Sequence, residues 1–345
     1  MVKPFINFCA LILLGAPVPA SSEEVLSEAG YHLGRGFPVA NTGLTLGGYT
    51  NLEVVAPHGG GAHFELSDLS LFLTWQAGER WRFFSEVELE NGLEVAEEQG
   101  FTTGEASLRL ERLYGDYSFA EALNVRLGKY LTPVSRWNLI HADPLVWTTS
   151  RPVVTERIFS QHATGAMLFG DTPLLGHELE YQLFTSVLDD PAPRPRDADF
   201  DKAYGLRAAY GDPGHSQLGF SYTDIRSNYP FVPEYHLFGM DGFWSRERYE
   251  LSGEFFYRRA DGKIPTQDVW GLYAQAVFPL SQRLYFIARQ EVYQGEFSDQ
   301  PAQLWIGGLA YKPVPPVVFK LEYGDGLHKT PETPVGFAAS ISVLF

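Results

Sequence analysis

The chain has 345 residues, of which 20% are charged, and its formal net charge is −16. This balance argues against a nucleic acid as partner, because an acidic surface repels phosphate and no basic patch stands out. Aromatic residues make up 14%, and there are 34 Gly and 23 Pro, so the chain is rich in residues that favour strands and turns.

Residues 1–20 have the pattern of a signal peptide. Lys3 precedes an apolar stretch at 8–15, and the small residues Val18 and Ala20 predict cleavage before Ser21. The apolar stretch is too short to cross a bilayer as a helix, although a retained membrane anchor is the alternative. Cys9, the only cysteine, lies in this segment. The mature chain is therefore expected to have no disulfide, thiolate metal site or cysteine nucleophile.

Residues 21–40 are polar and then broken by Gly and Pro, and we expect a short N-terminal tail there. Nothing after Ala20 has eighteen consecutive apolar residues, so the sequence predicts no transmembrane helix.

From residue 41 to 345, short segments alternate between apolar and polar residues, and none has a sustained helical period. A period of two indicates strands with two chemically different faces. We count about sixteen such segments, at 45–55, 65–75, 80–92, 106–119, 123–131, 164–170, 177–187, 202–211, 216–225, 234–245, 249–259, 269–280, 283–294, 302–312, 316–324 and 335–345.

The connections between these segments also alternate, in length. One set consists of tight turns, such as those at 77–79, 211–214 and 312–315. The other set is long and polar, at 56–63, 92–104, 131–162, 188–201, 226–234, 260–267, 295–301 and 325–334. Short turns at one end and long loops at the other are typical of a transmembrane antiparallel β-barrel with an even number of strands.

The C-terminal strand gives a more specific indication. Phe345 ends the chain, and Phe337, Ile341 and Val343 precede it at alternate positions. This pattern resembles the closing strand of Gram-negative outer-membrane barrels, although an ordinary buried strand that ends the chain is the alternative. The resemblance implies a location in the bacterial outer membrane, with the lipid bilayer, lipopolysaccharide and the barrel assembly machinery as partners, and it places the tail 21–40 in the periplasm.

The long connection at 131–162 differs from the other loops. It carries Trp137 and Trp147 and is too apolar for a solvated surface loop, and a structureless segment of this length is usually functional. It follows the fifth predicted strand, where sixteen-stranded general porins have a constriction loop folded into the lumen. The chain resembles that porin family over its mature length. The segment GKYLTPVSRW (128–137) also resembles phosphate-selective porins, whose dense Arg and Lys ladders this acidic chain lacks.

The resemblance implies a passive porin for small hydrophilic solutes or ions, with no cofactor, and it implies a homotrimer. The charged and polar residues of the loop are the candidates for the pore constriction: Arg136, His141, Asp143, Arg151 and Arg157. Strand parity places a further set on the wall as candidate pore lining: Arg82, Glu86, Glu88, Arg126, Glu178, Glu180, Glu250, Glu254, Arg258, Arg283 and Arg289. Each of these is alternatively a solvated wall residue. Together they set the field of a pore, because selectivity follows the sign of the lining charges.

Other chemistry has weaker support in the sequence. His141 and Asp143 are only two ligands, so a hydrogen-bonded pair is favoured over a metal site. The acidic residues of 188–201 lack the spacing of a calcium loop. A barrel hydrolase would need a nucleophile with a base, and Ser160 with His162 are neighbours in sequence only. A non-conducting barrel that serves as an adhesin or as a sheath for a partner is the other alternative.

Overall fold

The computed structural model describes residues 36–96, 100–103, 106–140, 142–192, 200–228, 234–262, 267–330 and 333–345. The predicted signal peptide, most of the predicted tail and His141 lie outside these residues. Among the helices of the described part, none is long and apolar enough to cross a membrane.

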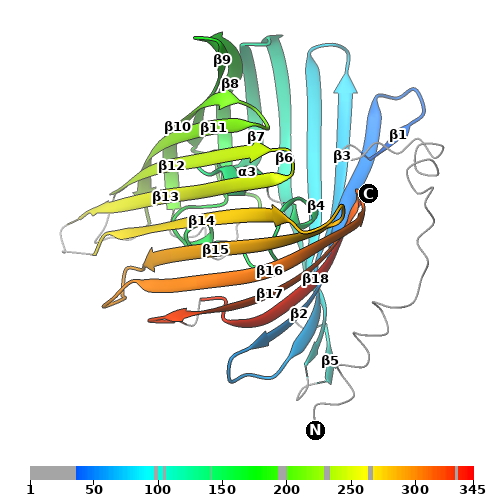
Figure 1. Cartoon of the computed structure of the whole chain (residues 1–345). Helices are drawn as coiled ribbons and strands as arrows, with labels where there is room; N and C mark the ends of the chain where they lie inside the picture. The colour runs from blue at the N-terminus through cyan, green and yellow to red at the C-terminus, as the bar shows by residue number, and fades with distance from the viewer. Residues whose placement is uncertain are drawn as a thin grey trace.

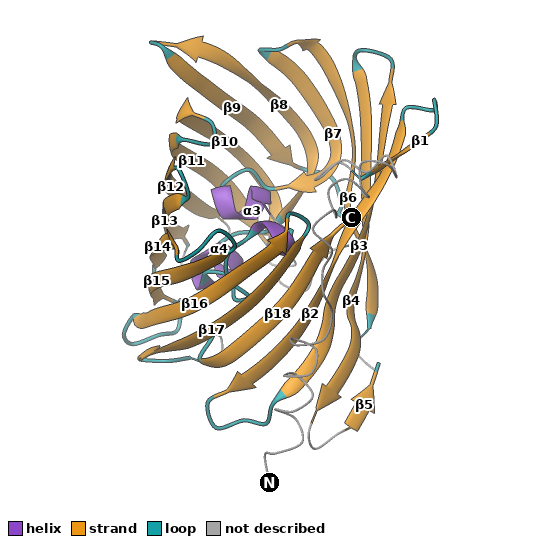
Figure 2. Ribbon diagram, turned by 45° about the vertical axis from the view of Figure 1, so that its right-hand side comes forward, coloured by secondary structure: helices purple, strands orange, loops and turns teal. Residues whose placement is uncertain are grey.

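In these described residues, eighteen strands form one antiparallel sheet, and the sixteen long ones close into a barrel (Figures 1 and 2). The other two, β1 (Phe37–Val39) and β5 (Gly100–Thr102), have three residues each and pair with β2 and β4. The long strands are β2 (Leu44–Pro57), β3 (His63–Ala77), β4 (Trp81–Ala96), β6 (Ser107–Ala120), β7 (Leu123–Leu131), β8 (His162–Leu174), β9 (His177–Ser186), β10 (Phe200–Asp212), β11 (Ser216–Ser227), β12 (Glu234–Arg246), β13 (Tyr249–Asp261), β14 (Val269–Pro279), β15 (Leu284–Gln294), β16 (Ala302–Val314), β17 (Val317–Leu327) and β18 (Gly336–Leu344). The predicted fold class, a barrel of about sixteen strands, is confirmed. Strand β1 lies within the segment predicted as the tail.

The barrel closes between its last and first long strands. Strand β18 pairs with β2 from Gly336 opposite Pro57 to Leu344 opposite Tyr49. The terminal Phe345 extends this seam, because its N–H donates to the Gly48 carbonyl at 2.8 Å and its carbonyl accepts from the Gly48 N–H at 2.7 Å. A Cβ at Gly48 would lie 2.9 Å from the Phe345 ring and 2.2 Å from the Ser70 carbonyl oxygen. The seam therefore needs glycine there.

The alternating pattern of each strand becomes an inner and an outer face. On β3, the exposed Leu71, Leu73 and Trp75 point outward, whereas Ser70 is fully buried on the inner side. Outward aromatic rings gather near both ends of the strands. The ring centroids of Trp75 and Phe83 are 5.4 Å apart, and those of Tyr323 and Phe337 are 4.7 Å apart. Strands with this division present apolar side chains to the surroundings and polar ones to the lumen, as membrane barrels do.

The connections alternate in length as predicted. Short turns join β3 to β4 and β8 to β9, for example, whereas β7 and β8 are separated by residues 132–161. This long segment contains α3 (Arg136–Ile140), the 3₁₀ turn η1 (Asp143–Leu145) and α4 (Val153–Arg157). Figure 2 shows α3 and α4 inside the barrel. The short helices have no long apolar face, so their placement depends on the barrel wall around them.

Candidate functional site

The segment 132–161, which we call the lumen loop, is closed at its base by its own backbone. The Thr132 N–H donates to the Gln161 carbonyl at 2.9 Å. The buried Asn138 side chain donates to both of these residues' carbonyls, at 2.9 Å to Thr132 and 3.0 Å to Gln161. The loop therefore leaves β7 and returns to β8 through one pinned base, and its middle is free to extend across the barrel.

Apolar side chains of the loop pack against the inner wall. Val154 and Ile158 of the α4 region are almost fully buried. Trp137 is also buried and meets the Tyr273 ring of β14 edge-on, at 5.8 Å between centroids. Trp147 lies 4.8 Å from the Tyr285 ring of β15. The high aromatic content that distinguished this segment in the sequence is thus used to pack a loop against the inside of a barrel.

Three buried glutamates on alternate strands accept hydrogen bonds from the loop. Glu254 of β13 accepts from the Ser135 hydroxyl at 2.6 Å and from the Trp137 N–H at 2.7 Å. Glu322 of β17 accepts from two successive backbone N–H groups, those of residues 149 and 150, both at 2.9 Å. Glu291 of β15 accepts from the Val153 N–H at 2.8 Å. Backbone donors that face a carboxylate form strong hydrogen bonds in a buried setting, so these three residues anchor the loop.

Two buried cations add to the attachment by binding loop oxygens. Arg289 donates to the Thr148 hydroxyl at 2.5 Å and to the Ser150 carbonyl at 2.9 Å, and its Nε donates to Glu291 at 2.8 Å. Lys320 donates to the Asp143 carbonyl at 2.7 Å. Each buried charge therefore has a partner, as a low-dielectric interior requires.

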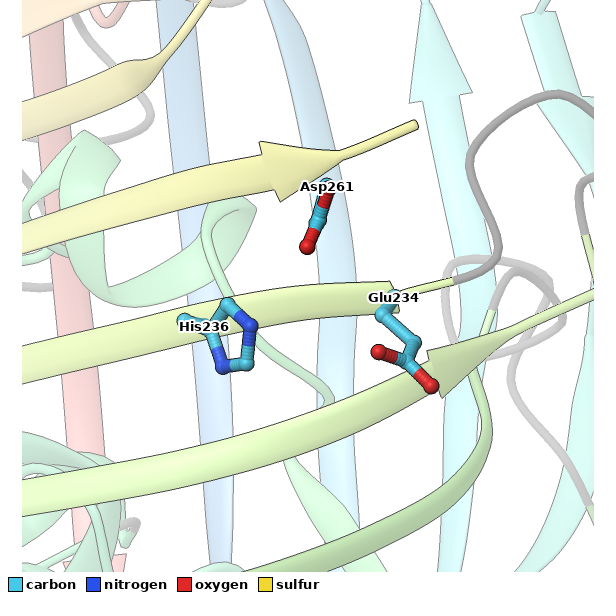
Figure 3. Close-up of side chains that lie close together, drawn as sticks. All are labelled: Glu234, His236 and Asp261. Carbon is cyan, nitrogen blue, oxygen red and sulfur yellow. The ribbon is translucent and has the colours of Figure 1, made fainter. Parts of the chain in front are cut away.

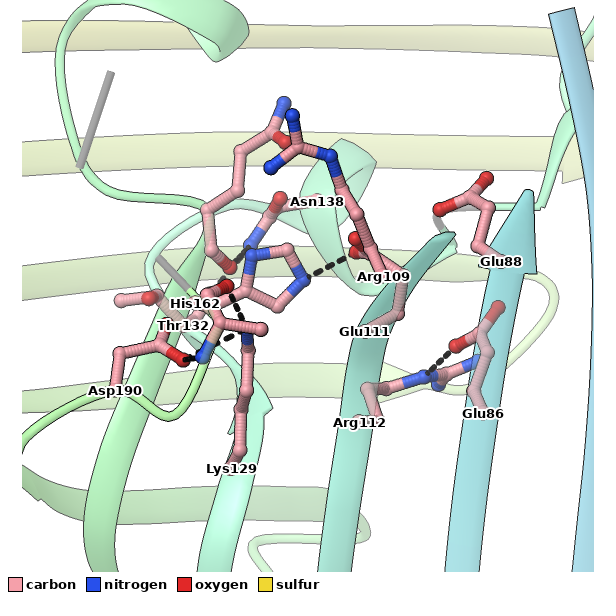
Figure 4. Close-up of polar contacts among 12 residues, drawn as sticks. Glu86, Glu88, Arg109, Glu111, Arg112, Lys129, Thr132, Asn138, His162 and Asp190 are labelled. Atoms are coloured by element: carbon pink, nitrogen blue, oxygen red, sulfur yellow. Dashed lines mark hydrogen bonds and ion pairs between the residues drawn. The ribbon is translucent and has the colours of Figure 1, made fainter. Parts of the chain in front are cut away.

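On the wall formed by β4, β6 and β7, arginines alternate with carboxylates. Arg112 pairs with Glu86 and Arg109 pairs with Glu90. Arg126 binds Asp116 through two nitrogens, at 2.7 and 3.0 Å. Figure 4 shows Glu86, Glu88, Arg109 and Arg112 on this wall. These side chains remain partly accessible on the arginine side, so the wall offers paired rather than isolated charges.

The base of the loop joins this wall through a second buried group. His162 Nε2 lies 2.8 Å from Glu111 Oε2, and both side chains are buried. Lys129 lies 2.9 Å from Asp190 and donates to the Ala192 carbonyl at 2.8 Å (Figure 4). The Ser160 hydroxyl donates to the His162 carbonyl oxygen at 2.7 Å and is not bonded to the ring. This arrangement lacks the geometry of a nucleophile with its base.

The predicted constriction residues lie in different settings. Arg151 is 3.5 Å from Asp143. Burial alone would lower the pKa of Arg151, but the carboxylates of Asp143 and Glu156 outweigh this effect and raise the pKa above its ordinary value. Arg136 lies over the Phe243 ring at 3.8 Å. Arg157 is half-buried in α4, and His141 is outside the described residues.

The predicted lining residues divide into three groups. Glu86, Glu88, Glu254 and Arg289 are buried and point inward, and Arg126 and Arg258 are partly buried, with Arg258 donating to the Ile158 carbonyl at 3.1 Å. Arg82, Glu178 and Glu180 share the inward parity but lie toward the end of the barrel with the short turns, whereas Glu250 lines a cavity together with Arg136 and Trp147 of the lumen loop. Arg283 lies in the turn before β15, outside the strands.

Several inward residues were missed by the sequence reading. Glu291 has the same parity as Arg289, so strand alternation also predicts an inward position for it. Arg109 and Arg112 differ in parity, and strict alternation cannot place both inside. A β-bulge at Glu111 shifts the register between β4 and β6 and makes this possible.

No known protein-family profile and no curated protein matches the sequence. Solved structures match instead. Against OmpF of Salmonella typhi in complex with daunomycin, the TM-score is 0.66 at 12% identity, covering 89% of this chain and 99% of that one. For in-vitro folded OmpT of Vibrio cholerae in its trimer form, the TM-score is 0.61 at 10% identity, and the match covers 88% of this chain and 99% of that one. For an anion-selective porin from Comamonas acidovorans, the TM-score is 0.55 at 13% identity, and the match covers 87% of this chain and 98% of that one. The chain therefore has the fold of the sixteen-stranded outer-membrane porins.

Proposed function

We propose that this protein is a porin of the Gram-negative outer membrane, through which small hydrophilic solutes or ions diffuse passively. The observation that carries the proposal is the attachment of the lumen loop by Glu254, Glu291 and Glu322. A barrel that served only as an adhesin or a sheath would not require a loop fixed inside its lumen. A loop held in this way narrows the pore at a fixed position. Transport through the pore is then filtered by the size of the solute and by the lining charges.

The charges along the path favour small neutral or singly charged solutes. Arg109, Arg112 and Arg126 each lie beside a carboxylate. Phosphate selectivity, which residues 128–137 suggest by resemblance, would need an excess of cations. The pairing supports a general filter over a phosphate-selective one.

The proposed setting brings its own partners. An outward face of apolar and aromatic residues suits contact with a bilayer and with lipopolysaccharide. The strand that ends at Phe345 would be the one presented to the barrel assembly machinery. OmpT of Vibrio cholerae is described in a trimer form, and we propose a homotrimer for this chain as well.

Planar-bilayer recordings of the purified, refolded mature chain test the function. We expect stable open channels. A variant without residues 136–151 is expected to have a higher conductance and to admit larger sugars into liposomes, because the loop no longer fills the lumen. A deletion of 297–300, in the loop between β15 and β16, serves as the control and should change neither measurement.

Folding of each variant is verified by the heat-dependent shift of the barrel's gel mobility. If folded wild type and folded deletion variant both fail to conduct, the protein is a non-conducting barrel and the proposal is wrong. If both conduct equally with the same size limit, the chain is a porin but the lumen loop is not its constriction.

A further inference from the structure

A cluster of potential metal ligands lies on the opposite face of the wall from the lumen. Glu234 and His236 of β12 and Asp261 of β13 each place one ligand atom within 4.8 Å of the others. Figure 3 shows the two carboxylates and the imidazole ring turned toward a common space. Glu234 and Asp261 are cross-strand partners, so the register of the two strands, rather than a flexible loop, brings them together.

Parity places this cluster on the outside of the barrel. On β12, Leu237 is buried inward, whereas Phe238 and Met240 are exposed outward, and His236 shares their side. The strand ends concerned adjoin the long connections, so the cluster lies at the rim with the long loops. It is therefore separate from the proposed pore.

The imidazole is held in an orientation that suits metal binding. Its Nδ1 lies 3.0 Å from the Tyr222 hydroxyl and 3.4 Å from Asp224 Oδ2, both on β11. A proton on Nδ1 shared with these oxygens leaves the lone pair of Nε2 free, and Figure 3 shows a ring nitrogen on the side of Glu234 and Asp261. Histidines that bind metals are commonly oriented by such an oxygen on their second nitrogen.

The charge balance also favours a bound cation. Three carboxylates, those of residues 224, 234 and 261, surround one imidazole at this rim. On the same face, Arg226 is the cross-strand partner of Glu234 and Arg259 that of His236, so three carboxylates are balanced by two guanidinium groups. In the part of the chain that the structure describes, neither arginine forms an ion pair with these carboxylates. One imidazole nitrogen with carboxylate oxygens selects ions such as Zn²⁺ or Ni²⁺, whereas Mg²⁺ and Ca²⁺ prefer oxygen ligands alone.

We propose that Glu234, His236 and Asp261 form a binding site for a divalent transition-metal ion that links β12 and β13 at the outer rim. The three protein ligands leave coordination positions open toward the outside of the barrel. Asp224 and Tyr222 act as positioning residues for the ring. The site goes beyond the proposed transport function and does not depend on it.

Equilibrium dialysis of the folded, EDTA-stripped full barrel in detergent tests the site, with ZnCl₂ as the probe and the bound metal measured by mass spectrometry. We expect one Zn²⁺ per chain with micromolar affinity. His236→Gln and the double variant Glu234→Gln/Asp261→Asn should each weaken binding at least about tenfold, because a ligand is lost. Asp224→Asn should weaken it less, and Co²⁺ bound in place of Zn²⁺ should give visible absorption that His236→Gln removes.

A matched control is available at the opposite end of the barrel. His177 lies 2.9 Å from Asp212 and is more exposed than His236, but no third ligand accompanies this pair in the described part of the chain. His177→Gln should therefore bind Zn²⁺ like wild type. The proposal is overturned if wild type binds no Zn²⁺, if His236→Gln binds it as tightly as wild type, or if equimolar Mg²⁺ displaces it. All these substitutions are on the surface, and gel mobility verifies that each variant is folded.

Discussion

At the scale of single residues, the site depends on buried charges with fixed partners. Glu254 illustrates this, because its two oxygens accept from the Ser135 hydroxyl, the Trp137 N–H and the Tyr273 hydroxyl, the last at 3.0 Å. Its amide would have one acceptor oxygen instead of two, so the NH₂ group would face the Trp137 N–H or the Ser135 hydroxyl, which already accepts from the Asn138 N–H at 3.1 Å. Such residues therefore fix the loop's conformation together with the apolar contacts around them.

Glu254→Gln should loosen the first part of the lumen loop. Each hydrogen bond to a charged group is worth about 1.5–3 kcal/mol, and the neutral amide keeps only one of the two acceptor oxygens. We expect larger and noisier single-channel currents and faster hydrogen exchange in residues 132–140. Glu178→Gln is the control, since that inward glutamate of β9 lies far from the loop near a short turn. Identical currents and exchange in wild type and Glu254→Gln would contradict the anchoring role.

Asp143→Asn should shift the channel toward anions. Arg151, 3.5 Å away, has a raised pKa and remains a cation throughout the accessible pH range, so removing the Asp143 carboxylate makes the surroundings of this cation less negative. A unit charge at about 4 Å in water is worth about 1 kcal/mol, or about fivefold in ion partitioning. Reversal potentials in a KCl gradient measure this. Asp212→Asn, in an exposed position at the end with the short turns, is the control and should leave the ratio of K⁺ to Cl⁻ permeability unchanged. An equal shift of this ratio in both variants would count against a role of Asp143 in the constriction.

At the scale of elements, the sequence predicts the strands well because each has two faces in different surroundings. On β3, for example, the apolar residues at alternate positions, Leu71, Leu73 and Trp75, directly indicate the outward face. Residue partners inside the barrel are not encoded in this way, since Glu254 and Ser135 are 119 positions apart. The helices α3 and α4 were also unpredictable, because five-residue helices are stabilised by the wall and not by their own pattern. The bulge at Glu111 breaks the parity on which the wall assignment depends.

Gly48→Val should destabilise the closure of the barrel. A side chain there would meet the Phe345 ring and the Ser70 carbonyl, and overpacking of this kind costs about 1–3 kcal/mol. The seam between β2 and β18 is held by backbone pairing and by the hydrogen bond that the Ser342 hydroxyl donates to Asn51 Oδ1 at 2.6 Å, and neither relieves this clash. We expect a lower midpoint in thermal gel-shift assays and slower refolding into detergent. Gly307→Val, on β16, is the control, because a Cβ there would have no atom within 4 Å. Equal midpoints for the two variants would show that the seam tolerates the side chain.

At the scale of the whole molecule, two populations of charge act on a permeating ion over different distances. Along the wall formed by β4, β6 and β7, Arg109, Arg112 and Arg126 are paired with carboxylates, so their fields largely cancel. The second population consists of exposed carboxylates near the long loops, such as Asp201, Asp261 and Asp299. Exposed charges attract counter-ions from a distance, but this attraction is screened by salt.

These two populations predict a cation preference that depends on ionic strength. The Debye length falls from about 10 Å at 0.1 M salt to about 3 Å at 1 M, whereas pairs inside the barrel are screened much less. Reversal potentials measured at a constant KCl ratio but increasing mean concentration should give a K⁺ to Cl⁻ permeability ratio above one that declines toward one. A ratio that stays constant would place the selectivity in the constriction, and Asp143→Asn would then abolish it. A ratio below one at low salt would instead show that the arginines beside the lumen loop dominate the field of the pore.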